Sequence, residues 1–349
     1  MSVKESTLSE RMRVLKEIIV DDSTKKLGFS SGNLVVKNAL NQIELVVSLN
    51  QLDSISVMGN PQITTQLIKA SAQKKKGLHY FSSSGKYLCS LDSHQDNYEK
   101  QITQFVASSS SSFQLLLAKR IIQSKILAQM SLLEAYNQDN LLTKEDFSHF
   151  HQSIAGVKAS ESVTQLIGFE GKAAKTYFYY LDLIIDPKFR FKRRTKRPPL
   201  DPFNSMISYG YHLLYSYLIG AIKKYGLNAG IGCIHKNRNY HATLASDLME
   251  SWRVIIVDEV VFNLISTQAV QPESFTYKGI NGVIMDRATR NLFLEALQKR
   301  VSEKHSFFHN DPKFYTSLYA IDLQIESLMR AYHEVDATLF ETIGGRIDV

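Results

Sequence analysis

Apolar residues in the first part of the chain form short runs rich in valine, isoleucine and leucine. Turn-forming Ser-Gly, Asn-Gln and Gly-Asn pairs separate the runs LGFSSGNLVV, IELVVSL and SISVMG, which is typical of strands joined by tight turns. The segment ITTQLIKASAQKKKG predicts one helix that ends at Gly77, and LHYFSSSGKYLCSL predicts a hairpin that turns at Ser84 and Gly85. For residues 9–19 we expect an additional helix. To about residue 92 the chain should be mainly β-structure.

From about residue 98 onward the apolar positions recur at helical spacing instead. In FQLLLAKRIIQSKILAQMSLLEAY they fall on one face of a helix, and the five serines at 108–112 should form a short loop before it. The pattern therefore predicts an α+β protein with a small β-rich N-terminal domain, residues 1–95, and a larger all-α C-terminal domain, residues 96–349. Further helices are expected at 171–185, 204–225, 242–265, 287–302 and 314–331.

Composition agrees with a folded protein that works in a reducing compartment. The chain has 349 residues, of which 44% are hydrophobic, and this is enough to bury a large core. Its two cysteines, Cys89 and Cys233, form neither a CxxC pair nor a disulfide framework. The first twenty residues have no apolar signal-peptide core, and the apolar stretch 209–222 is shorter than the about 20 residues of a membrane span. We expect a soluble, cytoplasmic protein in which 209–222 is a buried helix.

Several common catalytic signatures are absent from the sequence. It has no P-loop, no GxGxxG after a strand, no HExxH and no GxSxG. These absences argue against a P-loop nucleotide hydrolase, a Rossmann dehydrogenase, a zincin and a serine hydrolase of the α/β type. Cys233 lies near a histidine, but a Cys-x-His pair alone predicts a buried structural cysteine rather than a nucleophile.

The stretch CIHKNRNYHATLASDLMESWR, residues 233–253, concentrates side chains that can bind a metal. If a helix begins near His241, then Asp247 and Glu250 are three residues apart on one face, while the apolar positions form a separate packing face. Carboxylates suit Mg²⁺ or Mn²⁺, and one histidine shifts the preference toward Mn²⁺. The spacing leaves open whether His235 or His241 is that histidine. The alternative is an ordinary helix start whose acidic residues favour the helix dipole.

A further carboxylate occurs in IGFEGKAAKTYFYYLDLI. Glu170 stands beside Gly171, which we expect to begin a helix packed through Ala173, Tyr177 and Leu181. A carboxylate between an aromatic residue and a glycine at the start of a buried helix is a candidate site residue. The alternative is again a favourable interaction of Glu170 with the helix dipole.

A dense basic segment follows this helix. Seven of the ten residues at 188–197 are lysine or arginine, with two phenylalanines interleaved, and prolines follow. Such clustering predicts a loop that neutralises the phosphates of a polyanion, although a solvated basic loop is the alternative. The net charge of +7 agrees with the first interpretation. The candidate DNA-binding residues are Arg190, Lys192, Arg193, Arg194, Lys196 and Arg197.

Three segments in this order resemble one known family. GFEGKAAKTYF is followed by RPPLDPFNSMISYGYHLLYSYL and then by GIGCIHKNRNYHATLASDLMESWR. Together they are similar to the CRISPR-associated endonuclease that acts as the integrase of CRISPR adaptation, the family of the first-numbered Cas protein. The resemblance extends over nearly the whole chain, including the β-rich beginning.

The resemblance implies a metal-dependent DNA endonuclease and integrase that inserts short DNA segments, called spacers, into a CRISPR array. It implies that Glu170, His235 and Glu250 are ligands of Mg²⁺ or Mn²⁺ and that Asp247 belongs to the same catalytic site. The implied partners are double-stranded DNA, a second copy of the chain in a homodimer, and the second-numbered Cas protein in an integration complex. A metal-assisted attack by a DNA 3′-hydroxyl needs no covalent protein intermediate, which agrees with the missing nucleophile motifs.

Two other functions remain to be weighed. A non-catalytic nucleic-acid-binding scaffold of the same fold would not need its metal ligands, yet all of them are present. An unrelated phosphodiesterase could use the same histidine and carboxylates, but the order of the Glu170 segment before the Pro-Pro motif argues against it.

Overall fold

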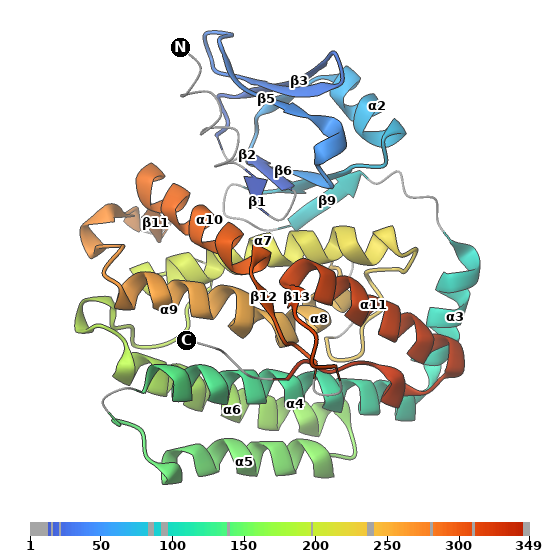
Figure 1. The fold of residues 1–349 in the computed structure, drawn as a ribbon, viewed down its shortest axis with the longest axis vertical. Helices are drawn as coiled ribbons and strands as arrows, with labels where there is room; N and C mark the ends of the chain where they lie inside the picture. Colours follow the sequence, from blue (N-terminus) through green and yellow to red (C-terminus); the bar gives the residue numbers. More distant parts are fainter. Residues whose placement is uncertain are drawn as a thin grey trace.

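The computed structural model describes residues 13–14, 17–20, 22–82, 87–91, 97–137, 140–196, 198–235, 241–279, 282–308 and 311–344. Two sheets gather at one end of the molecule, and long helices form the rest (Figure 1). The predicted α+β fold class is therefore confirmed. The proposed division at residues 95 and 96 stays a prediction, although the last strand at the β-rich end stops at Leu91 and the next helix begins at Tyr98.

The first sheet has five strands in the order β1-β2-β6-β8-β9. Its three central strands are parallel, and both edge strands run antiparallel to their neighbours. The helix expected at 9–19 is wrong in its described part, because β-branched Ile18, Ile19 and Val20 form a central strand, as such residues prefer. The strands are β1 (Arg13–Val14), β2 (Glu17–Val20), β6 (Ser54–Met58), β8 (Gly77–Phe81) and β9 (Tyr87–Leu91).

The second sheet has four strands in the order β5-β4-β3-β7, and helix α2 follows it. Helix α2 ends at Gln73 rather than at the predicted Gly77, because Lys75 has a positive φ of 55° and Gly77 already belongs to β8. The predicted hairpin is confirmed as β8 paired with β9, while its turn lies outside the described residues. The elements are β3 (Lys26–Ser30), β4 (Asn33–Lys37), β5 (Ile43–Ser48), β7 (Gln62–Ile63) and α2 (Thr65–Gln73).

One face of the five-stranded sheet packs on the N-terminal core, and the other face packs on the helices. Side chains alternate along β2, so that Ile18 and Val20 enter the N-terminal core while Ile19 enters the core of the helices. On β6 the buried Ser56 faces the helices, and its Oγ lies 2.9 Å from Oγ of Ser216 on α7. The sheet therefore packs directly on α7, the helix at the centre of the larger part.

The helical part follows most of the predicted periodicities, but helix α5 was not predicted, and two small hairpins depart from the all-α expectation. The apolar stretch 209–222 lies in the largely buried helix α7, as expected, and no helix in the described part is long and apolar enough to cross a membrane. The helices are α3 (Tyr98–Ser109), α4 (Ser111–Tyr136), α5 (Lys144–Ala159), α6 (Val163–Ile184), α7 (Pro202–Lys224), α8 (Thr243–Arg253), α9 (Glu259–Ser266), α10 (Arg287–Ser302) and α11 (Ser317–Glu334). Two small hairpins, β10 (Phe275–Tyr277) with β11 (Val283–Met285) and β12 (Lys304–His305) with β13 (Tyr315–Thr316), complete this part.

Two helix starts bear on the predictions. Helix α6 begins at Val163, where Ser162 caps it by accepting a bond from the Gln165 amide. The expected start at Gly171 is wrong, and Glu170 lies in the middle of α6. In the serine run, Ser110 alone separates α3 from α4, and its hydroxyl caps α4.

A π-helical turn, Val254–Asp258, joins α8 to α9. Arg300 on α10 supports it by donating to the Ile255 carbonyl at 2.9 Å. Asp258 at the end of the turn is buried and accepts hydrogen bonds from the hydroxyls of Tyr177 (2.8 Å) and Tyr211 (2.7 Å). These bonds tie the turn to α6 and α7, the helices that enclose the candidate site.

The titration of Asp258 should make stability depend on pH. Burial raises the pKa of Asp258 to about 6 from the ordinary 3.8, although Tyr211 and Tyr177 pull it down. The folded state therefore binds the Asp258 proton more tightly than the unfolded state does. Protonated Asp258 contributes its full stabilisation below about pH 4, and this stabilisation is lost as the pH rises through about 6. A shift of this size corresponds to about 3 kcal/mol.

We predict that Asp258→Asn removes this dependence. The difference in free energy of unfolding between parent and variant should change by up to about 3 kcal/mol between about pH 4 and 7, with the parent losing relative stability as pH rises. Urea unfolding at a series of pH values measures it. A difference that does not vary with pH would contradict the account.

Candidate active site

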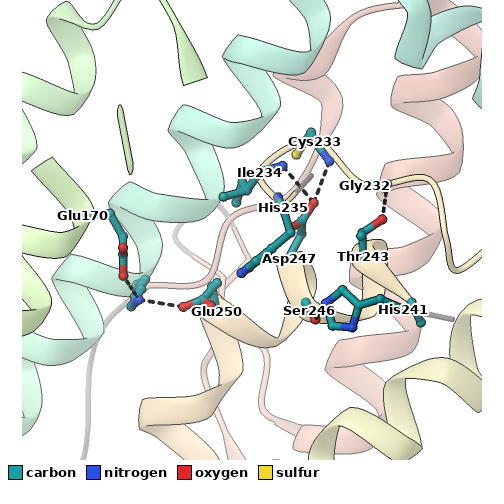
Figure 2. Close-up of polar contacts among 12 residues, drawn as sticks. Glu170, Gly232, Cys233, Ile234, His235, His241, Thr243, Ser246, Asp247 and Glu250 are labelled. Carbon is teal, nitrogen blue, oxygen red and sulfur yellow. Dashed lines mark hydrogen bonds and ion pairs between the residues drawn. The ribbon is translucent and has the colours of Figure 1, made fainter. Parts of the chain in front are cut away.

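Asp247, in the second turn of α8, fixes the loop that precedes the helix. Its Oδ2 accepts bonds from the amides of Cys233 (2.6 Å) and Ile234 (3.0 Å). Its Oδ1 accepts bonds from the amide of His235 (3.1 Å) and from ring Nδ1 of His235 (2.6 Å). Figure 2 shows these residues around the Asp247 carboxylate. Because both oxygens of this fully buried group are used by the loop, Asp247 positions His235.

A glycine allows the loop to come this close. A β carbon on Gly232 would lie 2.4 Å from Oδ2 of Asp247 and 2.9 Å from the backbone of Thr243. The helix backbone cannot yield as a flexible side chain can, so this approach requires glycine. The Gly232 amide also donates to Oγ1 of Thr243 at 3.0 Å, which fixes the loop to the helix start.

His235 keeps one ring nitrogen for other partners. With Nδ1 donating to Asp247, Nε2 is left for a ligand or a proton. The hydrogen bond to Asp247 raises the pKa of His235 above 6.5, although burial opposes the shift. The side chain is 41% exposed, so the ring is held firmly and still open to substrate.

Glu170 on α6 and Glu250 on α8 converge on one cation (Figure 2). Nζ of Lys125, on α4, lies 2.6 Å from Oε2 of Glu250 and also contacts Oε1 of Glu170. The Lys125 side chain is only 4% exposed. Three helices therefore meet at a buried cluster of two carboxylates and one ammonium.

Arg253 forms the other side of this cluster. It pairs with Oε1 of Glu250, and its guanidinium lies 4.8 Å from the centre of the Tyr211 ring, in a cation–π contact. Burial alone would raise the pKa of Glu250, but Arg253 and Lys125 outweigh it and lower that pKa to about 2. Glu250 is therefore ionised at neutral pH.

The predicted two-faced character of α8 needs correction. We expected Asp247 and Glu250 on a face separate from the packing face, but both are buried. The two side chains also have different partners. Asp247 accepts hydrogen bonds from the loop, while Glu250 forms ion pairs with Lys125 and Arg253. The spacing on one face was right, and the expected solvent exposure was wrong.

The expected metal ligands come together in part. Within the described part of the chain, no three histidine, cysteine, aspartate or glutamate side chains gather closely enough to hold a metal ion. Glu170 and Glu250 do meet at one cation, and His235 is near enough for its charge to lower the pKa of Glu250. Oε2 of Glu250 is buried, with a nearby ammonium but no hydrogen bond. A carboxylate oxygen held by an ammonium alone, beside a second carboxylate, occupies a place where a divalent cation fits.

The second candidate histidine has other partners. In His241, Nδ1 lies 3.3 Å from the Tyr215 hydroxyl and Nε2 lies 3.1 Å from Oγ of Ser246. Both nitrogens are thus engaged, and the geometry favours His235 for a ligand role. Cys233 is buried, and burial raises the pKa of its thiol well above the ordinary value. Such a thiol is a poor nucleophile, as expected.

The basic segment divides into exposed and packed residues. Arg190, Lys192, Arg193 and Lys196 are exposed, whereas Arg197 lies outside the described residues. Arg194 is packed inward, where it donates to Oδ1 of Asn204 at 2.9 Å and to Oγ of Ser208 at 3.1 Å.

The interleaved phenylalanines are not available to nucleic acid. Phe189 and Phe191 are buried, and Phe191 stacks on Phe203 with ring centres 4.2 Å apart. They anchor the segment on the helices, so that its cations line one side of a pocket.

That pocket opens directly beside the two carboxylates. Its volume is about 480 Å³, within the range of sites for small organic groups. Glu170 and Lys125 line it together with several further cations, an aspartate and aromatic side chains. The basic residues that line it are Lys175, Lys192, Arg193, Arg194, Lys196 and Arg253.

Sequence reasoning missed Lys125 and Arg253. Lys125 carried a signal, because it interrupts the apolar run IIQSKILAQM on the buried face of a long helix. A lysine there is costly unless it is paired. Arg253 lies three residues after Glu250, a spacing that permits an ion pair on the same helix face.

Comparisons with known proteins agree along almost the whole chain. The sequence profile of the family described as CRISPR associated protein Cas1 matches residues 18–299. The chain is 36% identical over 318 residues to a CRISPR-associated endonuclease Cas1 of Mycobacterium tuberculosis, covering 90% of this chain and 93% of that protein.

Solved structures show the same fold. A casposase bound to integration product superposes with a TM-score of 0.81 at 21% identity, covering 95% of this chain and 96% of the casposase. A chain of a Cas6-RT-Cas1–Cas2 complex superposes with a TM-score of 0.80 at 24% identity, covering 94% of this chain but 36% of that longer chain. From the sequence match and the shared fold together, the chain belongs to the Cas1 family of CRISPR-associated proteins.

Proposed function

We propose that this chain is a divalent-metal-dependent DNA endonuclease and integrase. It would promote attack of a DNA 3′-hydroxyl on a phosphodiester of a CRISPR array, so that a new P–O bond forms while the old one breaks and releases a 3′-hydroxyl. Short DNA segments would be inserted into the array in this way, in the cytoplasm. The observation that carries the proposal is the convergence of Glu170 and Glu250 on one cation beside a basic pocket. A non-catalytic scaffold does not require a buried Glu250 and a half-buried Glu170 to meet at one cation.

The metal would be Mg²⁺ or Mn²⁺, held by Glu170, Glu250 and Nε2 of His235. When bound, such an ion neutralises charge on a phosphoryl oxygen. Asp247 keeps the His235 ring in one orientation and tautomer. Arg253 holds the Glu250 carboxylate in place and keeps it ionised.

The exposed cations of the basic segment would hold the DNA strand. Lys192 and Arg193 line the pocket next to Glu170, so a phosphate bound there lies close to the carboxylates. Contacts of this kind position a backbone without reading its sequence. The fold of the casposase bound to integration product supports this arrangement.

The partners belong to the same proposal. A Cas1-like chain forms part of a Cas6-RT-Cas1–Cas2 complex, which supports the second-numbered Cas protein, Cas2, as a partner here. The casposase of the same fold is bound to integration product, which supports double-stranded DNA as the other partner. A homodimer of this chain is the expected unit that meets Cas2.

Glu250→Gln is predicted to remove Mn²⁺ binding and strand joining. Glutamine is the better test than alanine, because it removes the charge that a metal needs but keeps the side-chain volume and one acceptor oxygen for Arg253. Glu170→Gln should behave alike, and calorimetric titration with Mn²⁺ measures both.

Glu161→Gln, at an exposed position, is the matched control and should bind Mn²⁺ like the parent. If Glu250→Gln also binds like the parent, the ligand assignment is wrong. If Glu170→Gln and His235→Ala are silent as well, the metal site itself is refuted.

Asp247→Asn should lower the pKa of His235. The amide loses the negative charge that stabilises the protonated ring, and its NH₂ cannot accept the loop amides. NMR titration of labelled histidines reports the change directly, with His241 as an internal control. An unchanged His235 titration would show that Asp247 does not hold the ring.

Lys192→Ala combined with Arg193→Ala should weaken DNA binding equally for all sequences. The slope of log affinity against log salt should fall by about one unit per lost phosphate contact. Arg194 is left unchanged in this variant because it is packed against α7. Binding measured at several salt concentrations decides the matter.

The charge-matched control is Lys69→Ala combined with Lys299→Ala, both exposed and outside the pocket. It should leave the salt slope close to that of the parent. Equal slopes for the parent and both double variants would refute a role of the basic segment in binding phosphates.

A further inference from the structure

Lys125 occupies the point where a cation is needed. Its ammonium lies between Glu170 and Glu250, and its side chain is almost completely buried. Without it, two carboxylates would face one another in the interior, where like charges repel strongly. The contact to Oε2 of Glu250 is an ion pair at 2.6 Å without hydrogen-bond geometry. The ammonium also donates a hydrogen bond to Oε1 of Glu170, so one carboxylate holds it by a directed bond and the other by charge.

An alternative partner for this ammonium lies one turn further along α4. Gln129 is 2% exposed, lines the same pocket as Lys125, and has a buried Oε1 with no hydrogen-bond partner among the described residues. Residues four apart on a helix are neighbours. A buried amide oxygen without a donor is destabilising, and an ammonium that moves to Gln129 would supply this donor.

We infer that Lys125 is an internal counter-ion that a divalent metal ion displaces from Glu170 and Glu250, and that Gln129 accepts the displaced ammonium. The inference rests on the proposed metal-dependent function. It names a residue that holds the metal-free site together and competes with the metal.

The charges show what such an exchange achieves. In the described cluster, two carboxylates and two cations, Lys125 and Arg253, sum to a formal charge of zero. Adding a divalent ion while Lys125 moves by one turn changes the sum to +2. The site then attracts a phosphate, so metal binding prepares it for DNA. On the same count, which keeps Lys125 in the pocket, a monovalent cation would raise the sum only to +1.

The exchange predicts opposite effects of two substitutions on Mn²⁺ affinity. The carboxylates accept the metal only in the fraction of molecules that Lys125 has left, so Lys125→Met should bind Mn²⁺ about tenfold more tightly. Gln129→Leu removes the acceptor for the displaced ammonium while both ion pairs remain, so it should bind Mn²⁺ more weakly. Calorimetric titration of the full chain with Mn²⁺ gives both affinities.

Two further variants complete the experiment. Lys119→Met is the control, because Lys119 lies on the same helix but donates to the Lys158 carbonyl at 2.8 Å; it should bind Mn²⁺ like the parent. In the Lys125→Met background, Gln129→Leu should have no further effect, since no ammonium needs an acceptor. A further loss there would mean that Gln129 itself binds the metal, and would overturn the inference.

The remaining outcomes are equally decisive. If Lys125→Met binds Mn²⁺ with the affinity of the parent or more weakly, the exchange is overturned. The proposed function still stands in that case, provided that the parent binds Mn²⁺. If Lys125→Met does not fold, Gln129→Leu decides alone, and a parent-like affinity overturns the exchange. If the parent itself binds no Mn²⁺, the proposed metal site fails, and this inference with it.

Discussion

The meeting of Glu170 and Glu250 at Lys125 is the interaction on which the rest of the site depends. Removing a charge from water costs several kcal/mol even after the protein relaxes. A buried Glu250 and a half-buried Glu170 can therefore stay together only if cations and the packed helices keep them in place. Helices α4, α6 and α8 each contribute one of these three side chains, so the packing of the helices determines the geometry of the site.

The surrounding structure supports this cluster from several sides. Arg253 pairs with Glu250 and lies over Tyr211, whose hydroxyl binds Asp258 at the end of the π-helical turn. On the other side, Asp247 binds the loop that carries His235. An arrangement so costly in buried charge is weak evidence for stability, but it is typical of functional sites. The basic pocket beside it completes a site suited to a phosphodiester.

Much of the fold and the candidate site could be predicted from the sequence, because periodicity and motif order reflect local constraints. The helical patterns located α4, α7 and α10 well, and the spacing of Asp247 and Glu250 placed both on one side of α8. The strand at β2 was mistaken for a helix, because its pairing with β6 is a non-local contact that no local pattern reveals.

The errors at the site have the same origin. Spacing shows that two carboxylates share a face, but not that one binds a loop while the other pairs with Lys125 on a helix far away in sequence. Glu170 was placed at a helix start because Gly171 follows it, whereas the capping residue Ser162 lies a full two turns earlier. The basic segment looks uniformly exposed in the sequence. The sequence therefore did not reveal that Arg194, Phe189 and Phe191 are packed inward.

The account depends on Glu170 and Glu250 forming one cation site that can exchange its cation. A crystal structure of the protein with Mn²⁺, using anomalous scattering at the manganese edge, tests this most directly. The account predicts one manganese peak between the two carboxylates, with the Lys125 ammonium moved toward Gln129. Manganese bound elsewhere, or an unmoved Lys125 between Glu170 and Glu250 at saturating Mn²⁺, would contradict it.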